Sequence, residues 1–413
     1  MPEDDAAFGP DSQPLPEGGW SEEIVTLKGA TVVPPVESSF TQAAGVLDAD
    51  GRYCPHGALW RKYRPLTTEP KAPAEVTETL PGRWLWGGVL WAHFGHFLVE
   101  STARLWALNN LDAPVDGILF IPKRPKVGEA VRGFQRDFIG LMAPDLPIRV
   151  AAEPMRVEEL VVPGQGFGLG KITAGTGMFR DAIHQRFATD IAPDGPEKIY
   201  ISRSELGLGK GGLLGEERLE ELLKAEGYEI FHPQNHSIAT QLAHYKAAKK
   251  VIAADGSALH LFAMVGRADQ PVAMILRRQS GANNLLAQNV AQFCGSQPVV
   301  IGALRTEWVK AKQKKSNRLS FGEIDHSVLA RVLGETGFVR QGLDWPALTE
   351  AERQQSLTEK GLGGNEDFVE SPRYVRRRVQ AVREARRAAR AARKAGTEDQ
   401  TVDQAGVPET AAS

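Results

Sequence analysis

The sequence predicts an α/β fold built from two successive units, and three observations support this. Short apolar runs bounded by turn residues indicate strands, and segments with apolar residues at helical spacing lie between them. In the second unit the order strand, loop, helix recurs about three times, which favours a doubly wound parallel sheet. One strand–turn–helix stretch, residues 251–264, carries a polar turn typical of the ligand-binding edge of such a sheet.

In that stretch, residues 251–254 form a short apolar run typical of a buried parallel strand, and helical spacing resumes over residues 258–264. The turn between them is Asp255-Gly256-Ser257. It would present backbone N–H groups and the positive end of a helix dipole at the edge where open α/β sheets bind nucleotides and phosphates. The alternative is an ordinary turn in which Ser257 is the helix N-cap.

Composition excludes several classes of protein. The chain has 413 residues, enough for two domains and a tail, and a net charge of −2 argues against nucleic-acid binding. Two cysteines, Cys54 and Cys294, make neither a disulfide framework nor a zinc site. The acidic N-terminus does not resemble a signal peptide, and no apolar run reaches the roughly 18 residues of a membrane helix. These features predict a cytoplasmic protein.

Composition and periodicity divide the chain into six segments. We expect a disordered N-terminus (1–20), an N-terminal α/β domain (21–175), a C-terminal Rossmann-like domain (180–315), peripheral helices and a linker (316–371), a basic helix (372–395) and a disordered tail (396–413). The first domain should contain a strand at 83–89, broken at Gly87-Gly88, and a long helix at 91–109. The second should contain strands at 198–201, 228–231 and 271–276 and helices at 216–226 and 237–247, the latter capped by Ser237.

Residues 372–394 are rich in arginine, with Glu384 as their single acid. Intervening alanines favour a helix, and its apolar side is thin. The segment is therefore predicted to be an electrostatic arm, and a charged helix that only faces solvent is the alternative.

Polar groups interrupt an apolar helix at His93, His96 and Glu100. Because His96 and Glu100 are four residues apart, they share one helix face, where Glu100 could orient the imidazole or act as a base itself. A zinc pair would need histidines four apart, and His93 and His96 are three apart, so no metal site is expected. A surface or capping contact is the alternative.

Arg203 follows the strand at 199–201, where an anion would lie at the sheet edge, and its guanidinium suits phosphate. A surface salt bridge with Glu205 is the alternative. Lys210 could add a second cation. The loop at 207–212 also matches the dinucleotide fingerprint G-x-G-x-x-G, with Glu229 as a ribose contact, but residues 202–206 separate it from the strand, where the fingerprint needs a tight turn.

The order of these motifs resembles glycosyltransferase family 61, once described as capsular polysaccharide biosynthesis proteins. The resemblance covers residues 80–280. It rests on Gly95-His96-Phe97-Leu98-x-Glu100 with Arg104-Leu105-Trp106, on Ile199-Tyr200-Ile201-Ser202-Arg203, on Gly215-Glu216-Glu217, and on Asp255-Gly256-Ser257-Ala258-Leu259.

This resemblance implies a GT-B arrangement, in which two Rossmann-like domains face each other across a cleft and the C-terminal one holds a nucleotide-sugar donor. It also implies inversion at the anomeric carbon, no required metal or cofactor, and donor-binding roles for Arg203, Lys210, Glu216, Gly256, Ser257, Ala258 and Leu259. The sequence departs from the family pattern at Asp255, where histidine is usual, at Gly215, where asparagine is frequent, and at Lys210, near a frequent arginine. Asp255 would repel a diphosphate unless its side chain is paired or points away.

The residues themselves fit that chemistry. The departing diphosphate needs Arg203, Lys210 and the N–H groups near Gly256 and Ser257, since negative charge develops on it. The acceptor hydroxyl needs a base on the opposite face of the sugar, for which Glu100 and His96 of the acceptor-side domain are the candidates.

The resulting hypothesis is a metal-independent inverting hexosyl- or pentosyltransferase that acts on a bacterial surface or capsular glycan. Its acceptor would be a glycan or lipid-linked glycan, and residues 372–394 would contact anionic lipid at the inner face of the membrane. One alternative is a catalytically inactive subunit or glycan-binding module of a polysaccharide assembly system, motivated by Asp255. A weaker one is an NAD-dependent enzyme.

Overall fold

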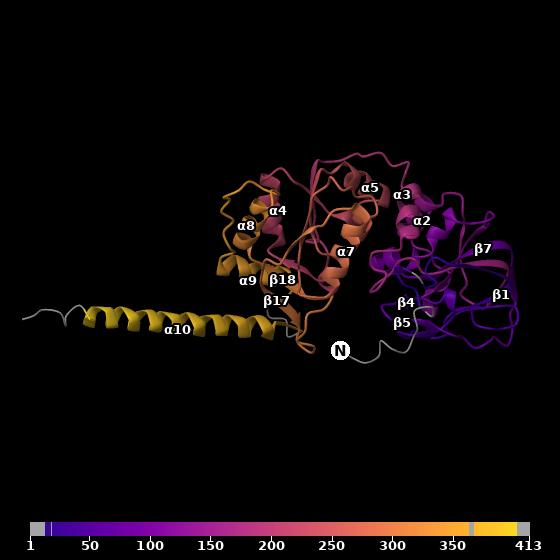
Figure 1. The fold of residues 1–413 in the computed structure, drawn as a ribbon, viewed down its shortest axis with the longest axis horizontal. Coiled ribbons are helices and arrows are strands. Elements are labelled where there is room, and N and C mark those ends of the chain that lie inside the picture. The colour runs from indigo at the N-terminus through magenta and orange to yellow at the C-terminus, as the bar shows by residue number, and fades with distance from the viewer. Residues whose placement is uncertain (1–12, 18, 363–366, 403–413) are drawn as a thin grey trace, which may run out of the picture.

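The computed structural model describes residues 13–17, 19–362 and 367–402 (Figure 1). Most of the N-terminal segment expected to be disordered, and residues 403–413 of the expected disordered tail, lie outside this part. Trp20, by contrast, is buried against Trp60, with ring centroids 6.4 Å apart. Residues 396–402, also expected to be disordered, continue the C-terminal helix α10 (Pro372–Val402).

The first sheet is mixed and has the strand order β3-β1-β10-β7-β8-β9. Its strands are β1 (Ile24–Val33), β3 (Gly45–Leu47), β7 (Glu78–Leu90), β8 (Gly117–Pro122), β9 (Ile148–Val150) and β10 (Met155–Pro163). β10, β7, β8 and β9 run parallel to one another, whereas β1 is antiparallel to both β10 and β3. The register slips between Trp86 and Gly88, at the expected glycine break. Gly87 is needed there because a Cβ would collide with the Phe120 ring.

The second sheet is entirely parallel and has the order β13-β11-β14-β15-β16. Its strands are β11 (Lys198–Ile201), β13 (Glu229–Phe231), β14 (Lys250–Ala254), β15 (Val272–Ile275) and β16 (Val299–Ile301). Successive side chains enter cores on opposite faces, with Ile199 and Ile201 on one side and Tyr200 on the other. The α/β class and the parallel second sheet predicted from the sequence are thus confirmed.

Helices cover both faces of this sheet. One face packs against α5 (Ile238–Ala247), α6 (Ala258–Ala263) and α7 (Ala282–Cys294), and the other against α4 (Glu216–Ala225) and α8 (His326–Glu335). The predicted cap of α5 is present, since Ser237 Oγ accepts a hydrogen bond from the Thr240 N–H at 3.1 Å.

A third sheet of order β12-β18-β17-β19 flanks the second. It consists of β12 (Gly212–Leu214), β17 (Leu304–Lys310), β18 (Phe321–Ile324) and β19 (Phe368–Glu370), and α9 (Glu350–Glu359) lies beside it. Residues 316–371, expected to hold helices and a linker, therefore also hold two strands. Two short pairs, β2 (Gln42–Ala43) with β6 (Thr67–Thr68) and β4 (Trp60–Arg61) with β5 (Arg64–Pro65), complete the N-terminal region.

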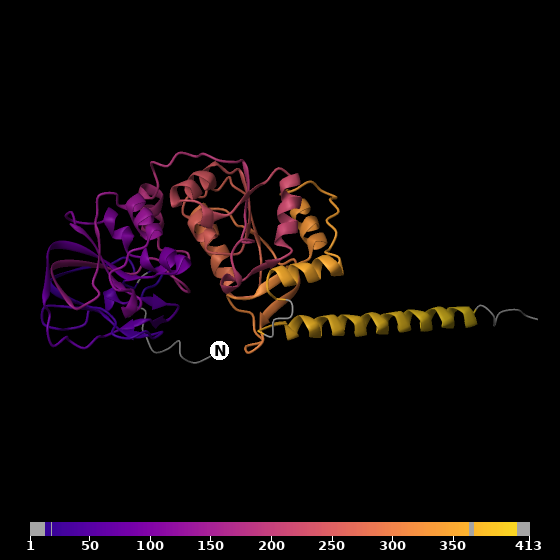
Figure 2. The same cartoon turned by 180° about the vertical axis from the view of Figure 1, so that it is seen from behind.

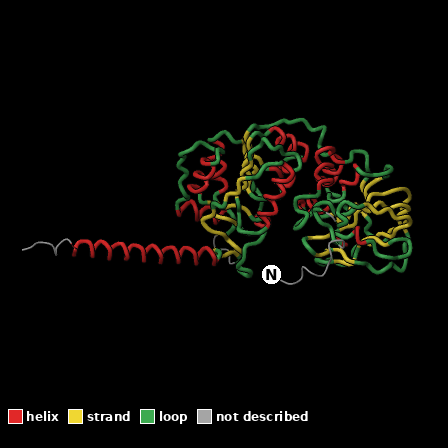
Figure 3. Tube along the Cα trace, in the orientation of Figure 1, coloured by secondary structure: helices red, strands yellow, loops and turns green. Residues whose placement is uncertain are grey.

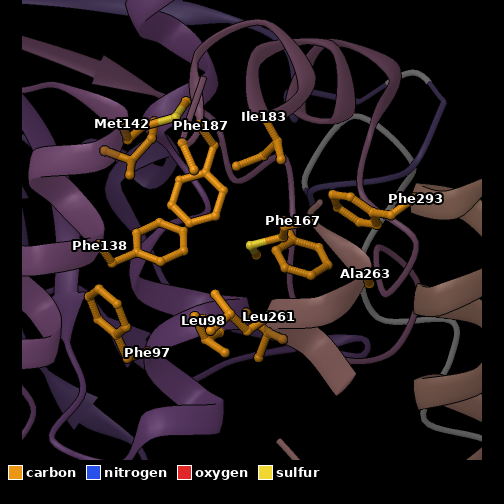
Figure 4. Close-up of a cluster of buried hydrophobic side chains, with 14 of the residues drawn as sticks. Phe97, Leu98, Phe138, Met142, Phe167, Ile183, Phe187, Leu261, Ala263 and Phe293 are labelled. Atoms are coloured by element: carbon orange, nitrogen blue, oxygen red, sulfur yellow. The ribbon is translucent and has the colours of Figure 1, made fainter. Parts of the chain in front are cut away.

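One hydrophobic core joins the first two sheets. It runs from α2 (Gly133–Met142) and α3 (Gly177–Arg186) of the first unit to α5, α6 and α7 of the second. Figure 2 shows the two units side by side, and Figure 4 shows Phe97, Leu98, Phe138 and Phe167 near Leu261 and Phe293. Since the core is continuous, the two units are packed together and are not merely tethered.

The prediction of one long helix at 91–109 is wrong. The segment breaks into α1 (Phe94–His96), a π-helical turn η4 (Phe97–Ser101) and a 3₁₀ turn η5 (Leu105–Asn109). Tertiary contacts account for the break. Ser101 Oγ donates to the Val89 carbonyl at 2.7 Å, and buried Arg104 donates to backbone carbonyls of the loop at 56–58. Such π-turns are frequent at functional sites.

Helix α10 extends away from the rest of the molecule (Figures 1 and 3). Its base is held by buried Tyr374 and by an ion pair from Arg378 to Glu370 on β19. No helix in the described ranges combines the length and the apolar character needed to cross a bilayer.

Candidate active site

The candidate site lies where the strand order of the parallel sheet reverses. β11 has β13 on one side and β14 on the other, so the chain runs outward in opposite directions from this pair. Arg203 follows β11, and Asp255, Gly256 and Ser257 follow β14. In open α/β sheets such a switch point, at the carboxyl ends of the strands, is where ligands bind.

The Arg203 guanidinium lies directly against Gly256. A Cβ on Gly256 would be 2.6 Å from one Arg203 Nη, so only glycine permits this approach. Another Nη donates to the carbonyls of Lys210 at 3.1 Å and Gly211 at 3.4 Å. Nε is buried and has no hydrogen-bond partner within the part of the chain that the structure describes. A buried unpartnered cationic donor favours an anionic ligand.

Burial lowers the pKa of Arg203 to about 10, and the positive charge of Arg277 adds to this effect. Arg203 still carries its charge at neutral pH. The salt bridge with Glu205, which was the alternative interpretation, is absent among the described residues; instead Glu205 accepts from Asn235 Nδ2 at 2.7 Å and lies 3.6 Å from His232.

Glu216 holds the backbone of the loop that carries Arg203. Its carboxylate is fully buried and accepts hydrogen bonds from the Arg203 backbone N–H at 2.8 Å and the Tyr200 hydroxyl at 2.9 Å. Burial raises the pKa of Glu216, and these hydrogen bonds oppose the rise. The structure therefore places Glu216 behind the loop. Gly215 is the N-cap residue of α4, the helix that begins at Glu216, and has φ +83°, a conformation that glycine adopts without strain.

Asp255 is neutralised by an arginine that sequence reasoning missed. Arg277 Nε lies 2.6 Å from Asp255 Oδ1, and both side chains are almost fully buried. Arg278 follows, with a buried unpartnered Nε, and burial and the charge of Arg277 lower its pKa. Two arginines directly after the strand at 271–276 were the signal in the sequence. The pairing meets the condition under which Asp255 does not repel a diphosphate.

The remaining predicted donor residues have different surroundings. Ser257 occupies the N-cap position of α6, as the alternative interpretation expected, but it has helical φ/ψ and its side chain makes no capping hydrogen bond. Ala258 is partly buried, and Leu259 is fully buried in the shared core. Lys210 is exposed at the end of the 3₁₀ turn η7 (Leu208–Lys210).

The glycines of 207–212 lead into strand β12 and not into a helix, which removes the structural context that a dinucleotide fingerprint requires. A cavity of about 330 Å³ adjoins this loop and is lined by residues 204–208, Phe321 and residues 358–361. Neither Arg203 nor the turn after β14 lines this cavity, so we do not assign the donor site to it.

The helical turn that carries His96 meets the turn after β14. A Cβ on Gly95 would lie 2.7 Å from Ser257 Oγ, so the two segments are in contact. Partial burial lowers the pKa of His93 to about 4, and the nearby charges of Lys210 and Arg203 contribute to the shift. The structure thus brings the histidine segment close to Arg203, although the two were predicted on separate units. Arg203 forms an arginine cluster with Arg277 and Arg278.

Glu100 lies behind His96. Its carboxylate is fully buried and accepts two hydrogen bonds of 2.7 Å from Arg61, one from Nε and one from an Nη. His96 Nδ1 is 3.2 Å from the second carboxylate oxygen, and the His96 side chain is 30% exposed. Burial raises the pKa of Glu100, but the hydrogen bonds from His96 and Arg61 outweigh burial and leave the pKa below its ordinary value. Glu100 is therefore ionised at neutral pH.

This contact determines which imidazole nitrogen can accept a proton. Nδ1 lies 3.2 Å from both the Glu100 carboxylate and an Arg61 Nη. Since an ionised carboxylate is the stronger partner, we assign the hydrogen to Nδ1, which leaves Nε2 bare. Trp91 stacks on the ring at 4.6 Å and fixes its plane. Arg61 came from a separate hairpin with no motif, so sequence reasoning missed it.

We expect Glu100→Gln to lower the free energy of unfolding by about 3 kcal/mol at pH 7, because it removes one charge from a buried ion pair and leaves Arg61 uncompensated. Since the folded pKa of Glu100 lies below its unfolded value, the wild-type advantage is complete above the unfolded pKa and is lost as pH falls through the folded one. Urea unfolding of both proteins from pH 7 to pH 3.5 measures this. If the difference in unfolding free energy between the wild type and Glu100→Gln increased as the pH fell, this prediction would be contradicted.

In the described ranges no three His, Cys, Asp or Glu side chains gather as they would around a metal ion. In comparison with protein families, residues 94–268 match the family described as Glycosyltransferase 61. No curated protein matches the chain. The matched range includes His96, Glu100, Arg203 and the turn after β14, whereas Arg61 and Arg277 lie outside it.

Proposed function

We propose that this chain, which is similar to glycosyltransferase family 61 over residues 94–268, is a glycosyltransferase that transfers a sugar from a nucleotide-sugar donor to a glycan hydroxyl with inversion and without a metal ion. The observation that carries the proposal is the Arg203 guanidinium lying on Gly256 at the switch point of the parallel sheet. The proposed GT-B arrangement has the first sheet on the acceptor side and the second on the donor side.

The donor's diphosphate would lie against the arginine cluster. When the bond to the anomeric carbon breaks, the electron pair leaves with the diphosphate, whose negative charge increases. Arg203 supplies an unpartnered Nε there, and Arg278 supplies another. Preorganised cationic donors of this kind can stabilise a leaving group without a metal ion. The ion pair with Arg277 would neutralise the neighbouring Asp255 carboxylate and so reduce its repulsion of the phosphates.

His96 would be the base on the acceptor side. With Nδ1–H directed to Glu100, Nε2 can take the proton of the acceptor hydroxyl as its oxygen attacks the anomeric carbon. A single attack opposite the leaving group inverts the configuration. Glu100 is fully buried and engaged by Arg61, so its proposed role is to orient His96 and stabilise the imidazolium. Of the two base candidates from the sequence, we therefore propose His96.

A thermal-shift screen over nucleoside diphosphates tests the donor side. A nucleotide present at ten times its dissociation constant should add about 1.4 kcal/mol to the stability of the folded state. Turnover is then followed as release of that diphosphate from the matching sugar donor. Binding without any release would favour the inactive-subunit alternative, whose original motive, an unpaired Asp255, is weakened by the contact with Arg277. Absence of binding to every nucleotide would remove the proposal.

We also propose that α10 contacts anionic lipid, which would place the enzyme at the inner face of a membrane near a lipid-linked acceptor. The helix projects from the body, and its described arginines between 376 and 390 are exposed; Arg378 also pairs with Glu370. Exposed Val375, Val379 and Val382 recur at helical spacing and give it a narrow apolar stripe. Clusters of basic residues on such a helix bind anionic membranes electrostatically.

Replacing Arg383, Arg386, Arg387 and Arg390 by glutamine should weaken binding to anionic vesicles by more than tenfold in low salt, since each basic residue contributes about 1 kcal/mol. The anchored base of the helix, with Tyr374 and Arg378, is left intact. Co-sedimentation with vesicles that contain phosphatidylserine, and with neutral vesicles as control, measures this. Equal sedimentation of variant and wild type would remove the role.

A further inference from the structure

An aromatic and cationic strip lies beside the proposed base. We define this strip by Phe40, Arg61, Arg64 and Trp91. The Arg64 guanidinium is 4.8 Å from the centroid of the Phe40 ring, and that of Arg61 is 5.7 Å from it. Arg61 is also 5.3 Å from the Trp91 ring, which stacks on His96. A continuous chain of contacts therefore runs from exposed Arg64 to His96.

Phe40 and Arg64, at the outer end of the strip, are exposed even though the backbone at Phe40 is firmly held. Phe40 is 50% exposed. Buried Lys123 fixes the segment, because its Nζ donates to the Phe40 carbonyl at 2.9 Å and to Gln42 Oε1 at 2.6 Å. This anchoring holds the Phe40 ring at a fixed place on the surface beside Arg61 and Arg64. Aromatic faces bind the apolar faces of sugars while polar edges stay available for hydrogen bonds.

The charges along the strip are positive and only partly neutralised. Arg61 is paired with Glu100, and Lys123 is engaged by an amide and a carbonyl. Arg64 contacts the Phe40 ring and forms no ion pair with an acid in the described chain. Arg64 is thus an exposed cation next to an exposed ring, and Arg124 adds charge close to Lys123.

We propose that this strip is the acceptor subsite and that the acceptor is an anionic glycan. The sugar next to the reacting hydroxyl stacks on Phe40, its negative group pairs with Arg64, and the hydroxyl itself reaches His96. The anion could be the carboxylate of an acidic sugar or the phosphate of a lipid-linked sugar, which share this chemistry. The assignment rests on the proposed function and names the substrate class of the same site.

Binding to the full-length protein tests the proposal by calorimetry in low salt. The probes are an oligosaccharide of uronic acids, its carboxyl-reduced neutral counterpart and a sugar 1-phosphate. The anionic probes should bind about tenfold or more tightly than the neutral one, and salt should remove the difference. Preference for the sugar 1-phosphate would identify phosphate as the anion, and preference for the uronic acids would identify carboxylate. Equal binding of charged and neutral probes, or no binding of any probe, would overturn the proposal.

Two variants assign the effect to the strip. Arg64→Gln should weaken the binding of the anionic probes about fivefold and leave the binding of the neutral probe unchanged. Phe40→Ala should weaken every oligosaccharide about five- to tenfold. Exposed Arg156→Gln and Met178→Ala, outside the strip, are the matched controls and should have no effect. If Arg64→Gln weakens the neutral probe as much as the anionic ones, the charge assignment is wrong.

The nucleotide thermal shift separates this proposal from the donor site. Both strip variants should keep the wild-type shift with nucleoside diphosphate, and with turnover available they should raise the acceptor KM more than they lower kcat. If the wild type showed no thermal shift with any nucleoside diphosphate, the proposed function would be refuted. Selective binding of an anionic glycan would in that case still support the strip as a glycan-binding site.

Discussion

Arg203→Ala should abolish the stabilisation of the protein by nucleoside diphosphate and lower turnover by about two to three orders of magnitude. Its guanidinium is the most direct cationic partner available to the diphosphate at the switch point, with a buried Nε that has no other partner in the described chain. Removing one preorganised donor from a site of developing negative charge has effects of this size. Thermal shift with and without nucleotide, and diphosphate release, measure the two effects.

Two further variants distinguish phosphate binding from a general loss of structure. Arg203→Lys keeps a charge but loses the planar fork, so we expect only partial recovery. Gly256→Ala keeps the arginine but pushes its guanidinium aside, because the new Cβ would lie 2.6 Å from an Nη. Exposed Arg331→Ala on α8 is the matched control. If Gly256→Ala and Arg203→Ala both bind nucleotide as the wild type does, the assigned phosphate site is wrong.

His96→Gln should lower kcat by about two to four orders of magnitude while nucleoside diphosphate binding persists. General-base contributions lie in this range, and glutamine cannot accept the proton of the acceptor hydroxyl. Glu100→Gln should lower kcat less, since the imidazole remains but loses the anion that orients it. The variant with the larger loss of kcat identifies the base, and the other identifies its positioning residue.

The control for this pair is His56→Gln, a histidine of the same unit that pairs with Glu23 at the surface and does not contact His96. It should retain wild-type turnover. If Glu100→Gln lost more activity than His96→Gln at equal folding, Glu100 would be the base after all, and its burial in this structure would have to be relieved during turnover.

Local patterns predicted the second unit well. The strand at 198–201 and the Ser237 cap are found as predicted, because short apolar runs and capping residues act within a few positions of the chain. The segment 91–109 shows where local reasoning fails. Its apolar spacing is helical, yet Ser101 and Arg104 satisfy distant backbone carbonyls and the helix breaks. Tertiary hydrogen bonds outweighed helix propensity there.

For the site, the sequence alone determined the residue types and their placement at strand ends. His96 with Glu100, Arg203, and the turn at 255–257 were identifiable because each follows a recognisable strand or helix pattern. The tertiary structure alone revealed their partners. Arg61 comes from a hairpin 39 residues before Glu100 and pairs with that carboxylate, which is buried and ionised. Arg277, 22 residues after Asp255, neutralises it. Such pairings depend on distances between strands that no periodicity along the chain records, because parallel strands adjacent in space are far apart in sequence.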